Sequence, residues 1–274
     1  MNILYGDVIA EAIKTELKTK FHQQNLKLAI IVASDDFGSK SYRRQIVKLA
    51  KELEVETIEV LVDETIQESE LINKITTLNN DPTITGILIQ RPLPKQLNSQ
   101  RIIESLASDK DVEGLHPYNL GRLLSGQTTM VPCTAKAVMK LVDYYQIPLS
   151  GKNVVIIGRS PTVGKPLAVL MTDRNATVTL CHTKTEALFS ITKKADIIVT
   201  AIGCAEFFDE TYFSENSIVI DVGINWNKEG ITGDVDYHKV VNLVKAITPV
   251  PKGVGSLTTV LLFENLSELK ERRK

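Results

Sequence analysis

The chain has 274 residues, of which 43% are hydrophobic and 24% charged, and its formal net charge at pH 7 is -1. This length can hold two modest domains, and the nearly balanced charge gives no reason to expect nucleic acid or an anionic membrane as a partner. No apolar run approaches the roughly 20 residues of a membrane span. Three widely spaced cysteines (Cys133, Cys181, Cys204) imply no disulfide framework, so we expect a globular protein of the reducing cytoplasm.

Short apolar runs alternate with segments of helical periodicity in the first half of the chain. Such alternation is typical of βαβ units with a mostly parallel sheet, and it predicts an α/β fold. The expected strands are 26–34, 55–62 and 84–90, and the expected helices are 41–54, 68–80 and 98–107. An irregular stretch, DKDVEGLHPYNLGRLLSGQ, then leads to an expected helix at 134–146.

The same rhythm restarts at SGKNVVIIGRSPTVGKP and resembles a mononucleotide-binding unit. The expected elements here are a helix at 165–174 and strands at 153–158, 176–181, 195–203 and 217–223. The last segment, 256–273, is apolar at helical spacing but has no sheet of its own, so we expect it to return to the first domain. The predicted domains are 1–132 together with 256–274, and 133–255.

A glycine turn opens this second half. In VVIIGRSPTVGKP, Gly158 ends a strand, Gly164 opens a helix, and Ser160 lies between them. A strand, glycine turn and helix in this order expose backbone N–H groups and the positive end of the helix to a phosphate. The spacing is G-x-S-x-x-x-G rather than G-x-G-x-x-G, so a plain βα turn stays open as an alternative.

The end of the next strand indicates which dinucleotide the turn holds. A site that prefers NAD places Asp or Glu there, against the ribose 2′-hydroxyl. The segment CHTKT (181–185) has no acid but offers His182, Thr183 and Lys184. Together with Arg159 these donors suit the oxygens of a 2′-phosphate, so the sequence favours NADP over NAD.

Metal sites are not expected. DKDVEG (109–114) imitates the first half of a calcium loop, but the twelfth position is Leu120 instead of a bidentate glutamate. The four histidines form no HExxH or paired Cys/His spacing, which argues against zinc.

Two further segments that contain prolines lie at positions suited to ligand binding. QRPLP (90–94) places Gln90 at the end of a buried strand, where open α/β sheets bind ligands, although Gln90 could instead only satisfy loop backbone. PVPKGVGSLT (250–259) places prolines and glycines before the last helix. Its glycines allow the backbone to approach a ligand closely, or merely a tight corner.

Taken together, these stretches resemble the methylenetetrahydrofolate dehydrogenase/methenyltetrahydrofolate cyclohydrolase family. The matches run nearly from end to end: Tyr42 in its helix, GILIQRPLP, KDVEGLHPYNLGRL, VPCTAKAV, GRSPTVGKP, ATVTLCHTKT, ADIIVTAIG, VIDVGIN, GDVD and ITPVPKGVGSLT. The resemblance implies an N-terminal catalytic domain completed by the C-terminal helix, a Rossmann domain that binds NADP, and a homodimer. It also implies that the folate lies in a cleft between the domains.

The resemblance assigns roles residue by residue. It implies that Tyr42 and Gln90 are the catalytic positions. The residues expected to face the folate are Tyr42, Gln90, Pro92, Glu113, Pro251, Lys252, Gly253 and Gly255. Those expected to contact the dinucleotide are Gly158, Arg159, Ser160, Gly164, Thr183 and Ile224.

This chain departs from the family pattern at folate-facing positions. The lysine of Y-x-x-x-K is Ile46, the second aspartate of DVDG is Glu113, and PVPGGVGP becomes PVPKGVGS with Lys252 and Ser256. Hydride transfer from the one-carbon bridge needs no side chain to take up a proton, whereas hydrolysis of the methenyl product needs activated water and moved protons. We therefore expect the dehydrogenase, with cyclohydrolase activity absent or weak.

Three alternatives remain at this point. Lys252 could supply the missing amine and preserve both activities. The chain could be a non-catalytic paralogue that binds folate or NADP, although the intact GRSPTVGKP and CHTKT stretches argue against it. It could also be a related two-domain dehydrogenase of shikimate type, a reading that requires a Lys/Asp pair which the sequence does not place.

Overall fold

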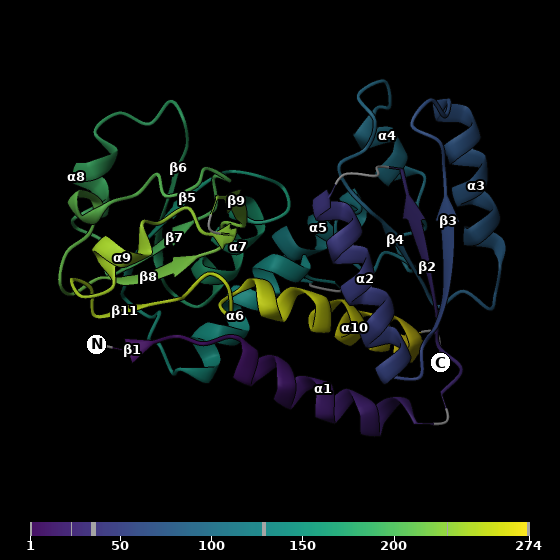
Figure 1. Cartoon of the computed structure of the whole chain (residues 1–274), viewed down its shortest axis with the longest axis horizontal. Helices are drawn as coiled ribbons and strands as arrows, with labels where there is room; N and C mark the ends of the chain where they lie inside the picture. Colours follow the sequence, from purple (N-terminus) through teal and green to yellow (C-terminus); the bar gives the residue numbers. More distant parts are fainter. Residues whose placement is uncertain (1, 23, 34–36, 128–129, 229, 273–274) are drawn as a thin grey trace. The chain divides into compact units, whose positions relative to one another are not determined.

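The computed structural model describes residues 2–22, 24–33, 37–127, 130–228 and 230–272. The chain forms two compact units, which we call the large-sheet unit (Met1–Ala12 and Pro132–Thr258) and the small-sheet unit (Ile13–Val131 and Thr259–Lys274). Each unit pairs a parallel sheet with helices, which confirms the predicted α/β class (Figure 1). The helices α1 (Asp7–Phe21) and α10 (Gly255–Arg272) each run from one unit into the other.

The small-sheet unit has a three-stranded parallel sheet in the order β3-β2-β4. The central strand β2 is paired on both sides. Its sequence KLAIIV is almost wholly buried, as expected for a strand covered on both faces. The elements are β2 (Lys27–Val32), β3 (Glu56–Leu61), β4 (Gly86–Ile89), α2 (Phe37–Glu52), α3 (Glu68–Asn80), α4 (Ser99–Glu104) and α5 (Pro117–Leu124).

Three helices of this unit differ from the expectation. Helix α4 ends at Glu104, three residues before the expected end at 107. Helix α2 begins at Phe37, four residues before the expected start at 41. Helix α5 lies in a stretch that the sequence analysis left irregular. His116 caps it, because its Nδ1 accepts the N–H of Tyr118, and Pro117 occupies the first helical position, where its missing N–H costs nothing.

Helix α10 packs against β4 in the small-sheet unit. A Cβ on Gly86 would collide with Val112 and lie 2.7 Å from Leu266 of α10, so only glycine lets the helix come this close. The inward side chains of α10, among them Leu262, Phe263 and Leu266, are fully buried. Burial of this apolar face is what fixes the helix on the unit.

The large-sheet unit has six parallel strands in the order β1-β11-β8-β7-β5-β6. Strands β5, β7 and β8 are continuous buried runs of Val and Ile, as expected for strands covered on both faces. Its strands are β1 (Asn2–Ile3), β5 (Asn153–Ile157), β6 (Thr177–Cys181), β7 (Ile197–Thr200), β8 (Ile218–Asp221) and β11 (Ala246–Ile247). Around them lie α6 (Cys133–Tyr144), α7 (Gly164–Asp173), α8 (Leu188–Thr192), η1 (Glu210–Tyr212), α9 (Tyr237–Val240) and the hairpin β9 (Asn225–Asn227) with β10 (Gly230–Thr232).

The first strand is the main difference in organisation. The sequence predicts residues 1–132 as part of one domain, whereas β1 pairs in parallel with β11 and so extends the large sheet. Two residues of strand carry too short a pattern to reveal a partner more than 240 positions away. Among the described residues, no helix combines the length and the apolar character needed to cross a membrane.

Candidate functional site

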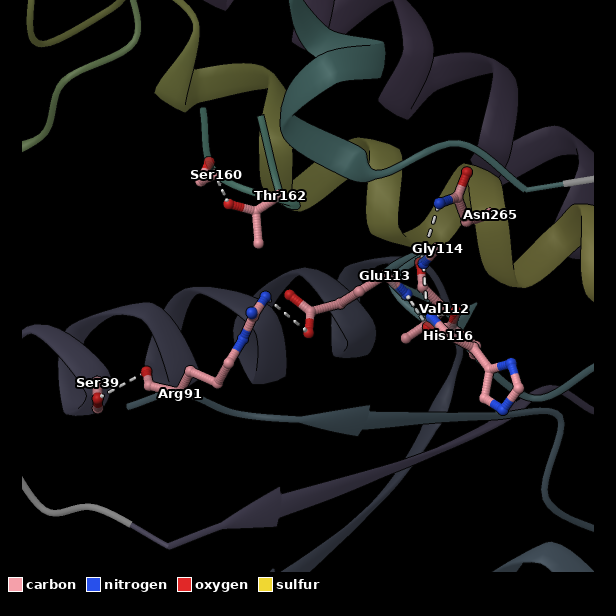
Figure 2. Close-up of polar contacts among 10 residues, drawn as sticks. Ser39, Arg91, Val112, Glu113, Gly114, His116, Ser160, Thr162 and Asn265 are labelled. Atoms are coloured by element: carbon pink, nitrogen blue, oxygen red, sulfur yellow. Dashed lines mark hydrogen bonds and ion pairs between the residues drawn. The ribbon is translucent and has the colours of Figure 1, made fainter. Parts of the chain in front are cut away.

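The turn between β5 and α7 accepts only glycine at two positions. A Cβ on Gly158, whose φ is +122°, would collide with the carbonyl oxygen of Ala201, and a Cβ on Gly164 would collide with the oxygen of Gly158. The Ser160 hydroxyl closes the turn from within, because it accepts the Val163 N–H at 3.1 Å. It also lies 3.0 Å from the Thr162 hydroxyl (Figure 2). The turn therefore presents bare backbone before the amino end of α7, an arrangement that suits phosphate.

Cationic and hydroxyl groups lie at the ends of the two neighbouring strands β5 and β6. The Gly158 N–H donates to the Cys181 oxygen at 2.9 Å, which brings the turn after β5 beside the end of β6. Arg159, Thr183 and Lys184 are exposed there, and Arg159 forms no ion pair with any described residue. These donors fit a dinucleotide that carries a 2′-phosphate, with the glycine turn as the cradle for its pyrophosphate.

A buried aspartate, which the sequence analysis did not single out, ties together the loops that leave β7 and β8. Asp234 is fully buried, with 0% of its surface exposed. Its carboxylate accepts the N–H groups of Ile202 (2.6 Å), Gly203 (3.2 Å) and Cys204 (2.9 Å) after β7. It also accepts the Asn225 side-chain amide at 3.0 Å after β8. One carboxylate therefore fixes both loops at the edge where such sheets bind nucleotides.

A second buried aspartate stands behind the first. Asp221 ends β8, and its carboxylate accepts the Thr200 hydroxyl at 3.0 Å and the Gly223 N–H at 2.9 Å. The backbone N–H groups of Asp234 (3.1 Å) and Val235 (2.9 Å) complete the set. Burial raises the pKa of Asp221 to about 6, and the negative charge of Asp234 adds to the effect.

The turn before α10 places a lysine where glycine is easier. Lys252 has φ +79°, a left-handed conformation, and its side chain is exposed. The turn is held in place because the Gly6 N–H donates to the Lys252 oxygen at 2.7 Å. At the end of the turn, a Cβ on Gly255 would lie 3.0 Å from the side chain of Ile224, which is 55% exposed. Ile224 and the 251–255 turn thus adjoin within the large-sheet unit.

In the small-sheet unit, one face of α2 looks toward the end of β4. Ser39, Tyr42 and Ile46 follow one another at spacings of three and four residues and share this face. Ser39 anchors it, because its hydroxyl donates to the Arg91 oxygen at 3.4 Å and its carbonyl oxygen accepts the Gln90 side-chain amide. Tyr42 is half-buried, and Ile46 is fully buried with 0% exposure.

The buried side chain of Gln90 uses only part of its hydrogen-bonding capacity. Its side chain is 4% exposed, and its Oε1 has no hydrogen-bond partner among the described residues. A buried acceptor of this kind is costly, and most such atoms in folded proteins are paired. Ile46, which shares its face of α2 with Ser39 and Tyr42, has no polar hydrogen to donate. The open acceptor is consistent with a donor that arrives with a ligand.

The DVEG loop after β4 is organised by Asp111. This buried carboxylate accepts four hydrogen bonds of 2.7 to 3.2 Å from the N–H groups of Glu113, Gly114 and His116 and from the Asn119 side chain. Within the calcium-like spacing noted in the sequence, the oxygens of Asp111 are therefore already used by the loop itself. Within the described ranges, no group of three or more His, Cys, Asp or Glu side chains is arranged to hold a metal.

Helix α10 fixes the same loop from the other side. The Asn265 amide donates to the Val112 oxygen at 2.9 Å (Figure 2). It also donates to the Val131 oxygen at 3.2 Å. Beyond this rigid backbone, the Glu113 side chain points to Arg91, with Nη2 and Oε2 3.9 Å apart. Burial raises the pKa of Glu113 to about 7, the Arg91 charge opposes the rise, and the Asp111 charge adds to it.

The residues singled out from the sequence thus fall into two groups, one in each unit. The small-sheet group surrounds the end of β4 and consists of Tyr42, Ile46, Gln90, Pro92 and Glu113. The large-sheet group lies at the ends of β5, β6 and β8 and in the turn before α10; it consists of Gly158, Arg159, Ser160, Gly164, Thr183, Ile224, Pro251, Lys252, Gly253 and Gly255.

Comparison with protein families agrees with both units. Residues 4–113 match the model described as tetrahydrofolate dehydrogenase/cyclohydrolase, catalytic domain. Residues 132–274 match the model described as tetrahydrofolate dehydrogenase/cyclohydrolase, NAD(P)-binding domain. The two matches together cover most of the chain.

Individual relatives match over almost the full length. A bifunctional protein FolD of Clostridium botulinum (strain Okra / Type B1) is 48% identical over 277 residues, covering 98% of both chains. The crystal structure of bifunctional FolD, a methylenetetrahydrofolate dehydrogenase/cyclohydrolase from Campylobacter jejuni, superposes with a TM-score of 0.96 at 40% identity and covers 100% of both chains. The Trypanosoma brucei enzyme, solved with NADP cofactor and inhibitor, gives a TM-score of 0.94 at 28% identity over 99% of this chain and 98% of its own.

Proposed function

The chain belongs to the tetrahydrofolate dehydrogenase/cyclohydrolase family, and on that premise we propose that it oxidises 5,10-methylenetetrahydrofolate to 5,10-methenyltetrahydrofolate with NADP. The observation that carries the proposal is the intact nucleotide side of the large-sheet unit. Its turn places two obligatory glycines before the amino end of α7, exposed donors suit the 2′-phosphate, and Asp234 holds the adjoining loops. When bound, NADP supplies the nicotinamide ring that accepts the hydride.

The small-sheet residues then have only to orient the folate. The half-buried ring of Tyr42 offers a face for stacking, and the Glu113 carboxylate suits the N–H groups on the amide edge of a pterin. As the hydride leaves, the nitrogen lone pairs beside the bridge carbon stabilise the growing positive charge. No protein group has to gain or lose a proton, so positioning and exclusion of water suffice.

The same residues are poorly equipped for the second activity of the family. Hydrolysis of the methenyl bridge needs a group that activates water and moves protons, and position 46 holds a fully buried isoleucine. Loss of positioned acid–base help costs on the order of 10²–10⁴-fold in rate. We therefore propose that cyclohydrolase activity is absent or strongly reduced in this chain.

One pair of assays tests both parts. NADPH absorbance after mixing the protein with NADP and 5,10-methylenetetrahydrofolate should rise at an enzymatic rate. Decay of synthetic 5,10-methenyltetrahydrofolate should stay near the rate in buffer alone. If no NADPH forms, the proposed dehydrogenase is refuted and the alternative of a non-catalytic paralogue is favoured. If hydrolysis proceeds at a rate close to the dehydrogenase rate, the proposed loss of cyclohydrolase activity is refuted.

A second candidate keeps both activities through Lys252. This lysine is exposed and forms no ion pair with any described residue, so its amine is available. If it does supply the missing proton transfer, Lys252→Met should abolish whatever hydrolysis the wild type has while the dehydrogenase persists. Hydrolysis that survives in Lys252→Met would eliminate this candidate.

The choice of NADP over NAD depends in the proposal on Arg159. Arg159→Gln should raise the KM for NADP about tenfold, the effect of losing roughly 1.4 kcal/mol of charge-assisted binding. The KM for NAD, which lacks the 2′-phosphate, should stay unchanged and serves as the internal control. Equal effects on both cofactors would show that Arg159 does not read the phosphate.

The proposal also includes a homodimer in the cytoplasm, as the family resemblance implies. Light scattering coupled to size-exclusion chromatography measures the oligomeric state. A mass of 30.4 kDa, that of a single chain, at micromolar concentration would contradict the homodimer.

A further inference from the structure

Arg91 occupies a distinctive place at the end of β4. It directly follows Gln90, and its carbonyl oxygen accepts the Ser39 hydroxyl of α2 at 3.4 Å, which fixes its backbone. Its guanidinium extends toward the DVEG loop and ends 3.9 Å from the Glu113 carboxylate (Figure 2). The resemblance expects a lysine at position 46, so Arg91 is a cation on a folate-facing edge that lacks its usual amine.

Glu113 needs such a partner because its backbone and its side chain are held differently. The backbone is rigid, since Asp111 accepts its N–H at 3.2 Å and Asn265 pins the preceding carbonyl group. The side chain, one methylene longer than aspartate, has more rotamers to lose when it is aimed at a ligand. Among the described residues, the carboxylate of Glu113 pairs with Arg91 alone.

The surroundings make that pairing stronger than a surface ion pair. The Glu113 side chain is 23% exposed, and a small cavity beside it is lined mainly by aliphatic residues: Ile87, Ile89, Ile103, Leu106 and Leu115. Charges interact more strongly where water is displaced by such groups. The same burial raises the pKa of Glu113 to about 7, and the second charged neighbour, Asp111, acts in the same direction. Arg91 is the group that opposes both.

We infer that Arg91 is a positioning residue for the folate, which acts through Glu113 by keeping its carboxylate charged and aimed at the pterin. A charged carboxylate accepts two parallel N–H bonds from the amide edge of a pterin, whereas a protonated one can offer only one acceptor there. The inference rests on the proposed function, because it takes the folate as the ligand of Glu113. It assigns to Arg91 a role that neither binds the cofactor nor moves a proton.

The test compares Arg91→Leu with Arg91→Lys across pH 6.5–9, from just below the pKa of Glu113, about 7, to about two units above it. Arg91→Leu keeps much of the bulk and removes the charge, and Arg91→Lys keeps the charge. At pH 7 the Leu variant should raise the KM for 5,10-methylenetetrahydrofolate about fivefold, because a rise of one pKa unit lowers the ionised fraction of Glu113 from about one half to about one tenth. Its kcat and its KM for NADP should change less than about twofold, and the KM difference should vanish near pH 9, where Glu113 is ionised with or without Arg91.

The outcomes separate this inference from the function on which it rests. Wild-type protein that fails to reduce NADP with methylenetetrahydrofolate would overturn the proposed function and the inference with it. Active wild type with a Leu variant whose KM ratio is the same at every pH, or unchanged throughout, would overturn the inference alone. Arg91→Lys should retain the wild-type pH profile; if Lys and Leu variants behave alike, charge is not what Arg91 contributes.

Discussion

The two units differ in how fully the buried polar groups near the ends of their sheets are paired, although Asp111 of the small-sheet unit accepts as many hydrogen bonds as the aspartates of the large-sheet unit. In the large-sheet unit, Asp221 and Asp234 each accept four hydrogen bonds, and every donor is within the unit. In the small-sheet unit, Gln90 Oε1 has no partner among the described residues, and the Glu113 carboxylate has only a long contact with Arg91.

This difference separates scaffold from binding surface. A carboxylate saturated by backbone N–H groups has no capacity left for a ligand, so the aspartate pair serves to shape the loops on which a ligand rests. A buried acceptor left open costs stability unless something else supplies the donor. The open groups at the end of β4 therefore mark where a ligand would bind, while the closed ones explain why the neighbouring loops are rigid.

The strongest way to sharpen the comparison is to restore a donor in the small-sheet unit. Ile46→Lys should raise hydrolysis of 5,10-methenyltetrahydrofolate by on the order of 10²-fold over wild type, since the amine supplies the missing proton transfer. It should also lower the free energy of unfolding, because Ile46 is fully buried and a lysine there must lose its water.

Ile46→Met is the matched control for Ile46→Lys, because it keeps an apolar side chain of similar size and should leave both activities unchanged. Dehydrogenase activity in the same preparation reports whether the Lys variant has folded. A variant with normal dehydrogenase and unchanged hydrolysis would mean that position 46 does not limit the second activity.

In the large-sheet unit the corresponding test removes a saturated acceptor. Asp234→Asn replaces one carboxylate oxygen with an NH₂ group, which cannot accept hydrogen bonds from the surrounding donors. We therefore expect the free energy of unfolding to fall by at least about 3 kcal/mol and NADP to bind more weakly. Urea titration measures the first. Quenching of Trp226, the single tryptophan of the chain and the neighbour of Asn225, measures the second without turnover.

Asp236, two residues on, provides the control. Its carboxylate caps α9 by accepting the Lys239 N–H, a role that asparagine fills equally well. It also forms a surface ion pair with the Lys239 amine at 2.8 Å, and such pairs contribute up to about 1 kcal/mol, so Asp236→Asn should stay within about 1 kcal/mol of wild type. If the two variants are equally stable, Asp234 does not hold the loops after β7 and β8 in the way that its contacts suggest.

How far the sequence predicted these features depends on how local each one is. Strands such as β5 and helices such as α3 follow from runs of neighbouring residues, and the expected limits 68–80 and the observed α3 coincide. The glycine turn was recognisable for the same reason. The roles of Asp111, Asp221 and Asp234 were missed, because each depends on bonds to backbone groups that the fold brings together.

Some signal for the aspartates was nevertheless present in VIDVGIN and GDVD. Gly223 and Gly233 each lie where a Cβ would collide with a carboxylate, of Asp234 and Asp221 respectively. Glycines that flank paired aspartates at two distant sites therefore indicate that the two segments pack tightly. The burial of Ile46 was less accessible, because helical spacing shows which residues share a face but not what covers that face.

The incompletely paired carboxylate of Glu113 predicts how the stability of the protein depends on pH. The pKa of Glu113 in the folded protein, about 7, lies above its ordinary value of 4.5. The proton that the folded state holds more tightly stabilises it fully below about pH 4.5, and this stabilisation is lost as the pH rises through 7. Glu113→Gln has no charge to bury, so it should be more stable than wild type at pH 8 by up to about 3 kcal/mol.

Urea titrations of both proteins at several pH values check this sign. The difference between Glu113→Gln and wild type should grow from near zero at pH 4.5 to its maximum at about pH 8. At the same time the KM for the folate should rise, because an amide offers one acceptor where the carboxylate offers two. A stability difference that does not vary with pH would show that Glu113 titrates normally.

The smallest expected effect concerns one of the positions in the large-sheet unit where a residue other than glycine holds a left-handed conformation. Lys252 holds φ +79°, a conformation that costs a residue with a Cβ about 1–2 kcal/mol, whereas glycine adopts it freely. Lys252→Gly should therefore raise the free energy of unfolding by about 0.5–1 kcal/mol, the remainder being offset by the greater freedom of glycine in the unfolded chain. Lys252→Ala loses the amine but keeps the Cβ, so it should show no such gain, and the difference between the two variants isolates the backbone strain. Equal stability of the two would mean that the turn accommodates a side chain at this φ without cost.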